Sequence, residues 1–102
     1  VVYFRINSAK LDKYLQVSIF NTAQFMKENN VPIMGIGYAD KKTGTGSYNM
    51  QLSEKRARAV AKELIDKYGI SSSQITIEWK GSDVQPYNEN NWNRVVIMSA
   101  NN

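Results

Sequence analysis

The sequence predicts a two-layer α/β fold in which two helices pack on a four-stranded mixed sheet. Strand-like and helix-like segments alternate in the order strand, helix, strand, helix, strand, loop, strand. The 102 residues suit one domain with one core, and no linker, internal repeat or low-complexity tract divides them. Hydrophobic residues make up 42% of the chain and charged residues 22%, as in ordinary globular domains.

The first third of the chain is predicted to hold a strand and a long helix. Residues 1–6 are mostly apolar and form the first strand candidate. Between residues 10 and 29, apolar side chains recur along one helical face. These side chains are Leu11, Tyr14, Leu15, Ile19, Phe25 and Met26. Val17 and Phe20 fall outside that stripe, so they either meet a partner or are simply exposed.

Residues 31–38 are predicted to form a buried central strand, because apolar residues dominate without a long polar interruption. The two glycines of this segment, Gly35 and Gly37, allow other backbone or side chains to come close. Residues 40–47 are rich in turn-forming residues, and we expect them to form a loop.

A second helix is predicted over residues 52–68, where Ala, Leu, Glu, Lys and Arg dominate. Ser53 is a candidate for its N-cap, and Gly69 is a candidate for the residue that ends it. Its apolar face is predicted to comprise Leu52, Ala57, Val60, Leu64 and Tyr68. Its solvated side is predicted to carry Lys55, Arg58, Lys62 and Asp66.

The last third of the chain is predicted to hold two strands. Residues 74–80 alternate, with Ile75, Ile77 and Trp79 on one face, which indicates a half-exposed strand. Residues 81–91 are polar and are predicted to form a loop. Residues 92–100 then form the final strand.

The amino-acid composition excludes several kinds of catalytic and metal-binding site. The chain has no cysteine and no histidine, which excludes disulfides, thiol nucleophiles, histidine bases and the usual zinc sites. No nucleophile and base can be placed together from the sequence, so we expect neither catalysis nor a cofactor. The net charge is +4, but Lys and Arg alternate with Glu and Asp along the helices, which favours a solvated surface over nucleic-acid binding.

The start of the chain suggests a domain from a larger protein. The sequence opens directly on a strand, and no signal peptide precedes it. No apolar run approaches the roughly 20 residues of a membrane-spanning helix. We therefore expect a single soluble domain over residues 1–102, belonging to a longer chain that supplies any targeting segment.

Asp40 and Arg56 form a candidate binding site. On the wheel of the second helix, Arg56 falls between Leu52 and Val60, on the shoulder of the packing face. A guanidinium there is partly desolvated and requires an anionic partner. Asp40 follows the central strand, and ligands of α/β sheets collect beyond strand ends. Together the two groups, which we expect to open into one solvent-reachable cleft, suit a ligand with one ammonium and one carboxylate, but a plain structural salt bridge is an alternative.

Two motifs carry a resemblance to a known family. They are Gly-Tyr-Ala-Asp at residues 37–40 and Tyr-Asn-x-x-Leu-Ser-x-x-Arg-Ala-x-x-Val at residues 48–60. With the glycine-containing loop between them, they resemble the C-terminal domain of OmpA, Pal lipoproteins and MotB. Supporting matches run over nearly the whole chain, so the resemblance implies the fold of that family, with its βαβαβ-β order.

The resemblance also implies a function. Members of this family bind bacterial peptidoglycan non-covalently through the diaminopimelate of the stem peptide. By resemblance, Asp40 takes the ammonium of that residue and Arg56 takes its carboxylate. The domain is then expected in the periplasm, where it anchors an outer-membrane or lipid-anchored protein to the cell wall without catalysis.

The resemblance implies further ligand contacts. Each of these residues either has a simpler structural explanation or differs from the family's usual residue. The residues concerned are Asn7, Ala39, Asn49, Leu52 and Arg94. Asn49 could instead cap a helix, Leu52 could belong to the core, and Arg94 could only brace the fold.

Two departures from the family pattern motivate an alternative function. Ala39 stands where the family has Thr, and Asn93 stands where a closing motif has Arg. A domain that kept the fold but lost the ligand would bind another protein instead, through exposed residues such as Val17, Phe20 or Tyr87.

Overall fold

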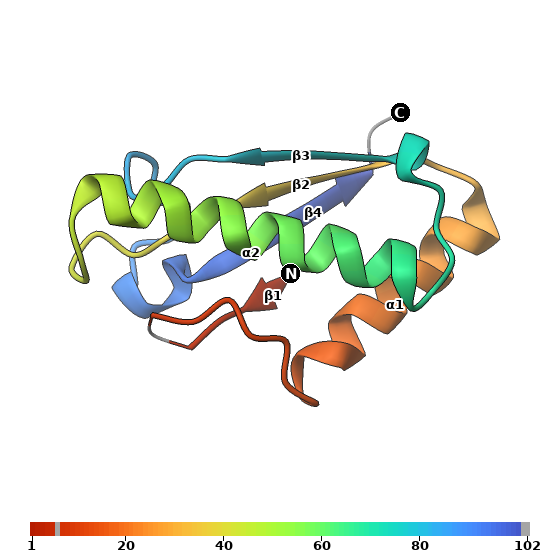
Figure 1. Cartoon of the computed structure of the whole chain (residues 1–102), viewed down its shortest axis with the longest axis horizontal. Helices are drawn as coiled ribbons and strands as arrows, with labels where there is room; N and C mark the ends of the chain where they lie inside the picture. Colours follow the sequence, from red (N-terminus) through yellow and green to blue (C-terminus); the bar gives the residue numbers. More distant parts are fainter. Residues whose placement is uncertain (6, 101–102) are drawn as a thin grey trace.

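The computed structural model describes residues 1–5 and 7–100. In this part of the chain, strands and helices alternate and two short 3₁₀ turns join them (Figure 1). In chain order the elements are β1 (Val2–Tyr3), α1 (Leu15–Asn29), β2 (Ile33–Gly37), α2 (Gly46–Asp66), η1 (Ser72–Gln74), β3 (Ile75–Trp79), η2 (Asn90–Asn93) and β4 (Val95–Ala100).

The strands form one mixed sheet in the order β1-β4-β2-β3. β2 pairs parallel with β3, whereas β4 pairs antiparallel with both β1 and β2. The parallel pair is joined through α2, because parallel neighbours need a long crossover connection. This arrangement confirms the predicted fold class of two helices on a four-stranded mixed sheet.

Both helices cover the same face of the sheet. The inward-facing residues of β2 alternate along the strand and are buried. One of them, Ile33, lies beside Phe25 of α1 and also beside Leu64 of α2. Burial of apolar side chains between these layers is the main driving force for folding. The core residues are Val2, Phe4, Ile19, Ala23, Met26, Ile33, Val60, Leu64, Ile70 and Val96.

Gly37 allows α2 to approach β2 closely. A Cβ atom at this position would overlap the backbone oxygen of Ser53 and lie 3.2 Å from the Cβ of Ala57. Only glycine therefore fits without moving the helix. This close contact confirms that a strand glycine admits a neighbouring backbone, and it places the middle of α2 against the end of β2.

The N-terminal elements are shorter than predicted. β1 comprises only Val2–Tyr3 within the expected residues 1–6, of which Ile6 lies outside the described residues. α1 begins at Leu15, not at residue 10. The Oδ1 atom of Asp12 accepts hydrogen bonds from the N–H groups of Tyr14 and Leu15 at 3.0 and 3.2 Å. These side-chain bonds hold the residues before Leu15 in a polar turn, and the helix begins only after it.

The predicted apolar face of this helix contains two exposed residues. Tyr14 is 68% exposed because it lies just before α1, where helical spacing does not apply. Phe25 is 45% exposed and borders a surface groove. Val17 and Phe20, which fall outside the stripe, are exposed, as both a partner contact and a plain surface position require.

The predicted loop after β2 is present, but it ends at Thr45 because α2 begins at Gly46. The predicted helix start at residue 52 and the predicted cap at Ser53 are therefore wrong. The true cap is Thr45, whose Oγ1 accepts a hydrogen bond from the N–H of Tyr48 at 3.2 Å. The first turns contain Gly, Ser, Tyr and Asn, which are weak helix formers, and tertiary contacts override that weak propensity.

Ser53 instead connects α2 to the loop after β3. It is fully buried within the helix. Its Oγ donates to the carbonyl of Met50 at 2.8 Å and accepts from the N–H of Gly81 at 2.9 Å. The hydroxyl thus satisfies a buried backbone donor that would otherwise be costly.

The rest of α2 matches the sequence pattern. Leu52, Ala57, Val60 and Leu64 are buried, and the charged residues of the predicted solvated side are exposed. Gly69 adopts a left-handed φ of 72°, and the N–H of Ile70 returns to the carbonyl of Leu64. This confirms Gly69 as the helix stop, because the left-handed conformation favours glycine.

Of the two C-terminal strands, β3 agrees with the prediction and β4 begins later than predicted. β3 matches the predicted alternating strand, with Trp79 packed against the helix layer under the guanidinium of Arg58. β4 begins at Val95 instead of residue 92, because Asn90–Asn93 form the 3₁₀ turn η2. Among the described residues, no helix combines the length and apolar character needed to span a bilayer.

Candidate functional site

The candidate site lies beyond the C-terminal end of β2. Asp40 follows this strand by three residues, and Arg56 projects from the middle of α2. Both residues are buried, since Asp40 is 3% exposed and Arg56 is 0% exposed. The sequence predicted only partial desolvation for Arg56, so its burial is deeper than expected.

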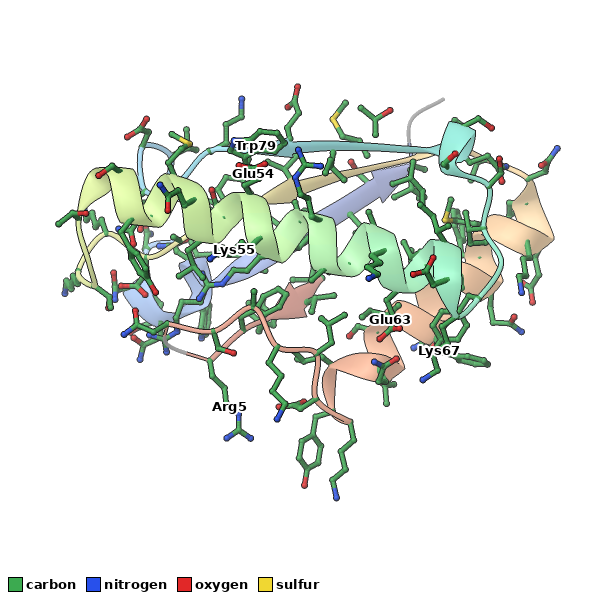
Figure 2. All side chains as sticks on the ribbon, viewed as in Figure 1. Arg5, Glu54, Lys55, Glu63, Lys67 and Trp79 are labelled. Atoms are coloured by element: carbon green, nitrogen blue, oxygen red, sulfur yellow. The ribbon has the colours of Figure 1, made fainter. Side chains whose placement is uncertain are left out.

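Backbone carbonyls hold the Arg56 guanidinium. Its Nε donates to the carbonyl of Ser8 at 2.9 Å, and its Nη1 donates to that of Tyr38 at 3.0 Å. Its Nη2 donates to the carbonyl of Arg5 at 3.1 Å, although the Arg5 side chain extends away from the domain (Figure 2). The Phe4 ring lies 5.4 Å from the guanidinium carbon. Carbonyls orient the cation without neutralising it, and two of its five N–H donors have no acceptor in the described part of the chain.

Asp40 is contacted by the loop that precedes β4. Asn90 donates its Nδ2 to Oδ1 of Asp40 at 3.1 Å, and Nη1 of Arg94 lies 3.5 Å from Oδ2. Within the described residues Asp40 forms its ion pair with Arg94, not with Arg56. The alternative of a plain Asp40–Arg56 salt bridge is therefore not what the structure contains.

The charges around Asp40 act on both groups of the site. Burial raises the pKa of Asp40, but hydrogen bonds from Thr43 and Asn90 and the nearby Arg94 charge outweigh this effect, so its pKa lies below the ordinary value. Burial lowers the pKa of Arg56 to about 10, with Asp40 opposing the shift and Arg94 adding to it. Both groups are therefore charged at neutral pH.

The structure places Asn49 and Ala39 beside Asp40. Asn49 is buried and donates its Nδ2 to the backbone oxygen of Asp40 at 3.3 Å. Ala39 is buried beside Asp40, and Leu52 is buried on α2. Asn49 lies inside α2, not at its cap, so its role is to hold the Asp40 backbone.

Asn7 was predicted to contact the ligand, whereas the contact of Asn90 with Asp40 was not predicted. Asn7 is exposed, with a left-handed φ of 53°, between the two residues whose carbonyls bind Arg56. Its backbone position beside those two residues places Asn7 next to the Arg56 contacts, and among the described residues its side chain forms no hydrogen bond. Asn90 was missed, because an Asn in an Asn-rich loop gives no signal of its partner.

A groove beside the site is lined by Tyr3, Phe4, Asn91, Trp92 and Arg94, and we call it the aromatic groove. Its volume is about 450 Å³. We call Asp40 and Arg56 together the charged pair, although they form no salt bridge with each other. Two walls of the groove contact them, because Phe4 lies on the Arg56 guanidinium and Arg94 lies on the Asp40 carboxylate. The charged pair is thus covered by these walls, whereas the sequence predicted that it would open directly into a cleft.

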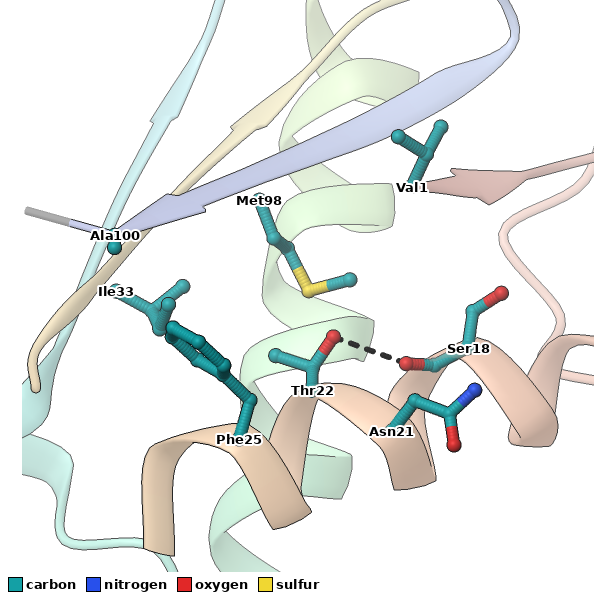
Figure 3. Close-up of a pocket in the computed structure, with 8 residues that line it drawn as sticks. All are labelled: Val1, Ser18, Asn21, Thr22, Phe25, Ile33, Met98 and Ala100. Carbon is teal, nitrogen blue, oxygen red and sulfur yellow. Dashed lines mark hydrogen bonds between the residues drawn. The ribbon is translucent and has the colours of Figure 1, made fainter. Parts of the chain in front are cut away.

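A second groove lies at the opposite end of the sheet, between α1 and the strands (Figure 3). Its volume is about 420 Å³, and it contains none of the predicted site residues. Its lining residues are Val1, Ser18, Asn21, Thr22, Phe25, Ile33, Met98 and Ala100. In the described residues, no cluster of acidic side chains suited to a metal ion occurs here or elsewhere.

Comparison with known proteins identifies the family. The OmpA family model matches residues 3–96. The chain belongs to the OmpA family. Its sequence is 61% identical over 100 residues to outer membrane protein 40 of Porphyromonas gingivalis, covering 98% of this chain and 26% of that protein. It is 35% identical over 82 residues to the peptidoglycan-associated lipoprotein of Buchnera aphidicola, covering 79% of this chain and 46% of that protein.

Solved structures agree with the fold of this OmpA-family chain. The C-terminal domain of Helicobacter pylori MotB superposes with a TM-score of 0.85 at 20% identity, covering 99% of this chain and 82% of that structure. The peptidoglycan-associated lipoprotein of Burkholderia pseudomallei superposes with a TM-score of 0.78 at 26% identity, covering 97% and 86%. The chain spans about a quarter of the length of outer membrane protein 40, so the activity of the longer protein is a separate question.

Proposed function

We propose that this domain binds the peptidoglycan stem peptide through diaminopimelate and so anchors an outer-membrane protein to the cell wall. In this proposal Asp40 accepts the ligand's ammonium and Arg56 donates to its carboxylate. The supporting observation is a buried cation and a buried anion that are close in space but not paired with each other. A zwitterionic amino-acid centre is the ligand that would satisfy both.

The geometry of Arg56 supports the carboxylate half of the proposal. Three backbone carbonyls fix the guanidinium plane before any ligand arrives. Its full positive charge is buried and lacks an anionic partner at salt-bridge distance among the described residues. Such a charge is costly until an anion reaches it, and the planar fork of the guanidinium suits a carboxylate.

The geometry of Asp40 supports the ammonium half. Its contact with Arg94 is long, at 3.5 Å, and Nε of Arg94 is buried without an acceptor in the described structure. Arg94 also disfavours the charge on Arg56. A ligand ammonium could replace Arg94 on Asp40 while the ligand carboxylate screens the two guanidinium groups from each other.

The relatives support the cellular setting. One is named an outer membrane protein and another a peptidoglycan-associated lipoprotein. A further neighbour of the same fold is described as the cell wall anchor of a secretion system of Pseudomonas aeruginosa, with a TM-score of 0.74. We infer that the domain lies in the periplasm and that its parent chain is held in or at the outer membrane.

Co-sedimentation with isolated sacculi tests the proposal. Asp40→Asn keeps the size of the side chain but removes its charge, so we expect affinity to fall about tenfold to a hundredfold, the range of one lost charged hydrogen bond. Asp66→Asn is the matched control, because Asp66 is exposed at the end of α2. Equal pelleting of the two variants, with both shown to be folded by circular dichroism, would reject the role of Asp40.

Titration with free stem peptides tests the role of Arg56 without changing the protein. A tripeptide ending in diaminopimelate is compared with one ending in lysine, which has the ammonium but lacks the second carboxylate. We expect the lysine peptide to bind at least about tenfold more weakly, since it leaves the guanidinium without its anion. If neither peptide binds at millimolar concentration, the alternative of a protein-binding domain is favoured, with exposed Val17 and Phe20 as its contacts.

A further inference from the structure

Two amide side chains, those of Gln85 and Asn93, hold the backbone around Asp40, and the stem-peptide proposal gives them no role. We propose that both are positioning residues, which fix the segment that carries Asp40 so that its carboxylate meets the ammonium of a ligand. Neither side chain contacts the ligand itself. The inference rests on the proposed function and extends it from the charged groups to the residues that place them.

Gln85 binds the backbone on both sides of Asp40. Its Nε2 donates to the carbonyl of Ala39 at 3.0 Å, and its Oε1 accepts from the N–H of Lys41 at 3.2 Å. One planar amide thus restrains both residues that flank Asp40. Since Asn49 binds the carbonyl of Asp40 from α2, the segment is held by the helix as well as by the loop after β3.

Asn93 holds Gln85 in the orientation that these contacts need. Its Nδ2 donates to Oε1 of Gln85 and to the carbonyl of Tyr87, both at 2.9 Å, and its Oδ1 accepts from the N–H of Tyr87 at 2.8 Å. Oε1 of Gln85 therefore faces two N–H donors, whereas its Nε2 faces carbonyl oxygens. Only one of the two orientations of the amide satisfies both ends.

The same two amides fix the partners of the Asp40 carboxylate. Asn93 ends η2, the turn that begins with Asn90, and Arg94 follows it. Both Asn90 and Arg94 contact the carboxylate, and Oδ1 of Asn90 also accepts from the N–H of Lys42 at 3.3 Å. Neutral hydrogen bonds therefore bring the anion and its neighbours together, and they add no charge that would compete with a ligand.

The structure gives the departure at Asn93 a different meaning from a lost ligand contact. Its side chain is 1% exposed, with both of its N–H groups and its oxygen bonded, and it reaches the Asp40 segment through Gln85. A buried polar network with its bonds satisfied gives a loop one fixed arrangement. The departure therefore favours an ordered Asp40 and not an abandoned site.

NMR titration of the Asp40 carboxyl group tests the positioning role without any ligand. Gln85→Met keeps the length of the side chain but removes its hydrogen bonds to the Asp40 segment. We expect the pKa of Asp40 to rise in this variant, because its carboxylate no longer meets Asn90 and Arg94 in one fixed arrangement. Gln51→Met makes the same change at an exposed position of α2 and should leave that pKa unchanged.

A second variant tests whether Asn93 acts through Gln85. Asn93→Leu should raise the same pKa, and the two changes together should raise it by less than the sum of their separate effects. A merely stabilising role would lower the free energy of unfolding without moving the pKa of Asp40 in the folded chain. An unchanged pKa in folded Gln85→Met, whose altered side chain is only half-buried, would overturn the positioning role.

Calorimetry with the diaminopimelate tripeptide measures the consequence for binding. We expect Gln85→Met to raise the dissociation constant about tenfold and Gln51→Met to keep the wild-type value. Equal affinities of the two variants would overturn the positioning role and leave the stem-peptide site standing. If the wild-type chain does not bind the tripeptide, the stem-peptide site is rejected instead, and the pKa of Asp40 alone decides whether the two amides position its carboxylate.

Discussion

At the residue scale, a few polar neighbours decide the protonation state of Asp40. Burial alone would raise its pKa, but Asn90, Thr43 and Arg94 stabilise the carboxylate and hold its pKa below the ordinary value. The group therefore remains an anion when buried, as a partner for an ammonium must be. The chain has no histidine, so the site contains no group that ordinarily titrates between about pH 5 and 8.

The lowered pKa of Asp40 predicts a pH-dependent contribution to stability. The native state binds fewer protons than the unfolded state, so the stabilisation is complete above about pH 4 and is lost as the pH falls through the native pKa. Asp40→Asn should therefore lower the free energy of unfolding most at neutral pH and least in acid.

Urea unfolding of both chains between about pH 7 and about pH 2 measures this difference. Asp66→Asn, at an exposed position, should differ little from wild type throughout. A deficit of Asp40→Asn that grows toward low pH would mean that folding raises the pKa of Asp40 instead of lowering it.

At the element scale, the site depends on how closely α2 lies on β2. Gly37 of β2 faces the backbone of α2 at Ser53, one turn before Arg56. Ser53 also binds the N–H of Gly81 and so ties the loop after β3 to the same turn. The depth of Arg56 is thus a consequence of backbone packing and not of its own side chain.

Gly37→Ala is expected to destabilise the domain by about 1–3 kcal/mol, because the new methyl group must push the α2 backbone away from the strand. Gly35→Ala is the matched control on the same strand. Its Cβ would meet side chains at ordinary distances, the nearest being Cγ1 of Val96 at 3.7 Å. Thermal and urea unfolding compare the two variants, and equal losses would show that close helix approach is not the cause.

At the scale of the whole molecule, Arg56 connects segments that are far apart in the chain. It is carried by α2, and its guanidinium holds the segment after β1 through Arg5 and Ser8 and the end of β2 through Tyr38. The candidate site is complete only when these segments and the loop before β4 come together. Under the proposed function, ligand binding would therefore be linked to folding.

Arg56→Ala should cost about 3 kcal/mol or more of unfolding free energy, since it leaves buried carbonyl groups without donors. Arg58→Ala removes the same side chain from the exposed side of α2 and should cost about 1 kcal/mol or less. Chemical denaturation gives both values. Similar losses in the two variants would mean that the carbonyl contacts contribute little.

Local patterns made much of the fold predictable. The alternation of β3, the buried stripe of α2 and the stop at Gly69 are read over a few residues, and the structure confirms each of them. Element ends were predicted less well, because they depend on caps that compete with one another. Thr45 and Ser53 are both acceptable capping residues, and only contacts with Gly37 and Gly81 place Ser53 inside the helix.

The sequence by itself determined the fold class and nominated Asp40 and Arg56 as the charged pair, because periodicity and family motifs are properties of side-chain order. Only the tertiary structure decided what each charge contacts. Arg56 binds carbonyl oxygens of residues 48 and 51 positions away, and Asp40 meets Asn90 and Arg94 at 50 and 54 positions. Every residue has a carbonyl, so no side-chain pattern marks the ones that a folded chain brings to a buried cation.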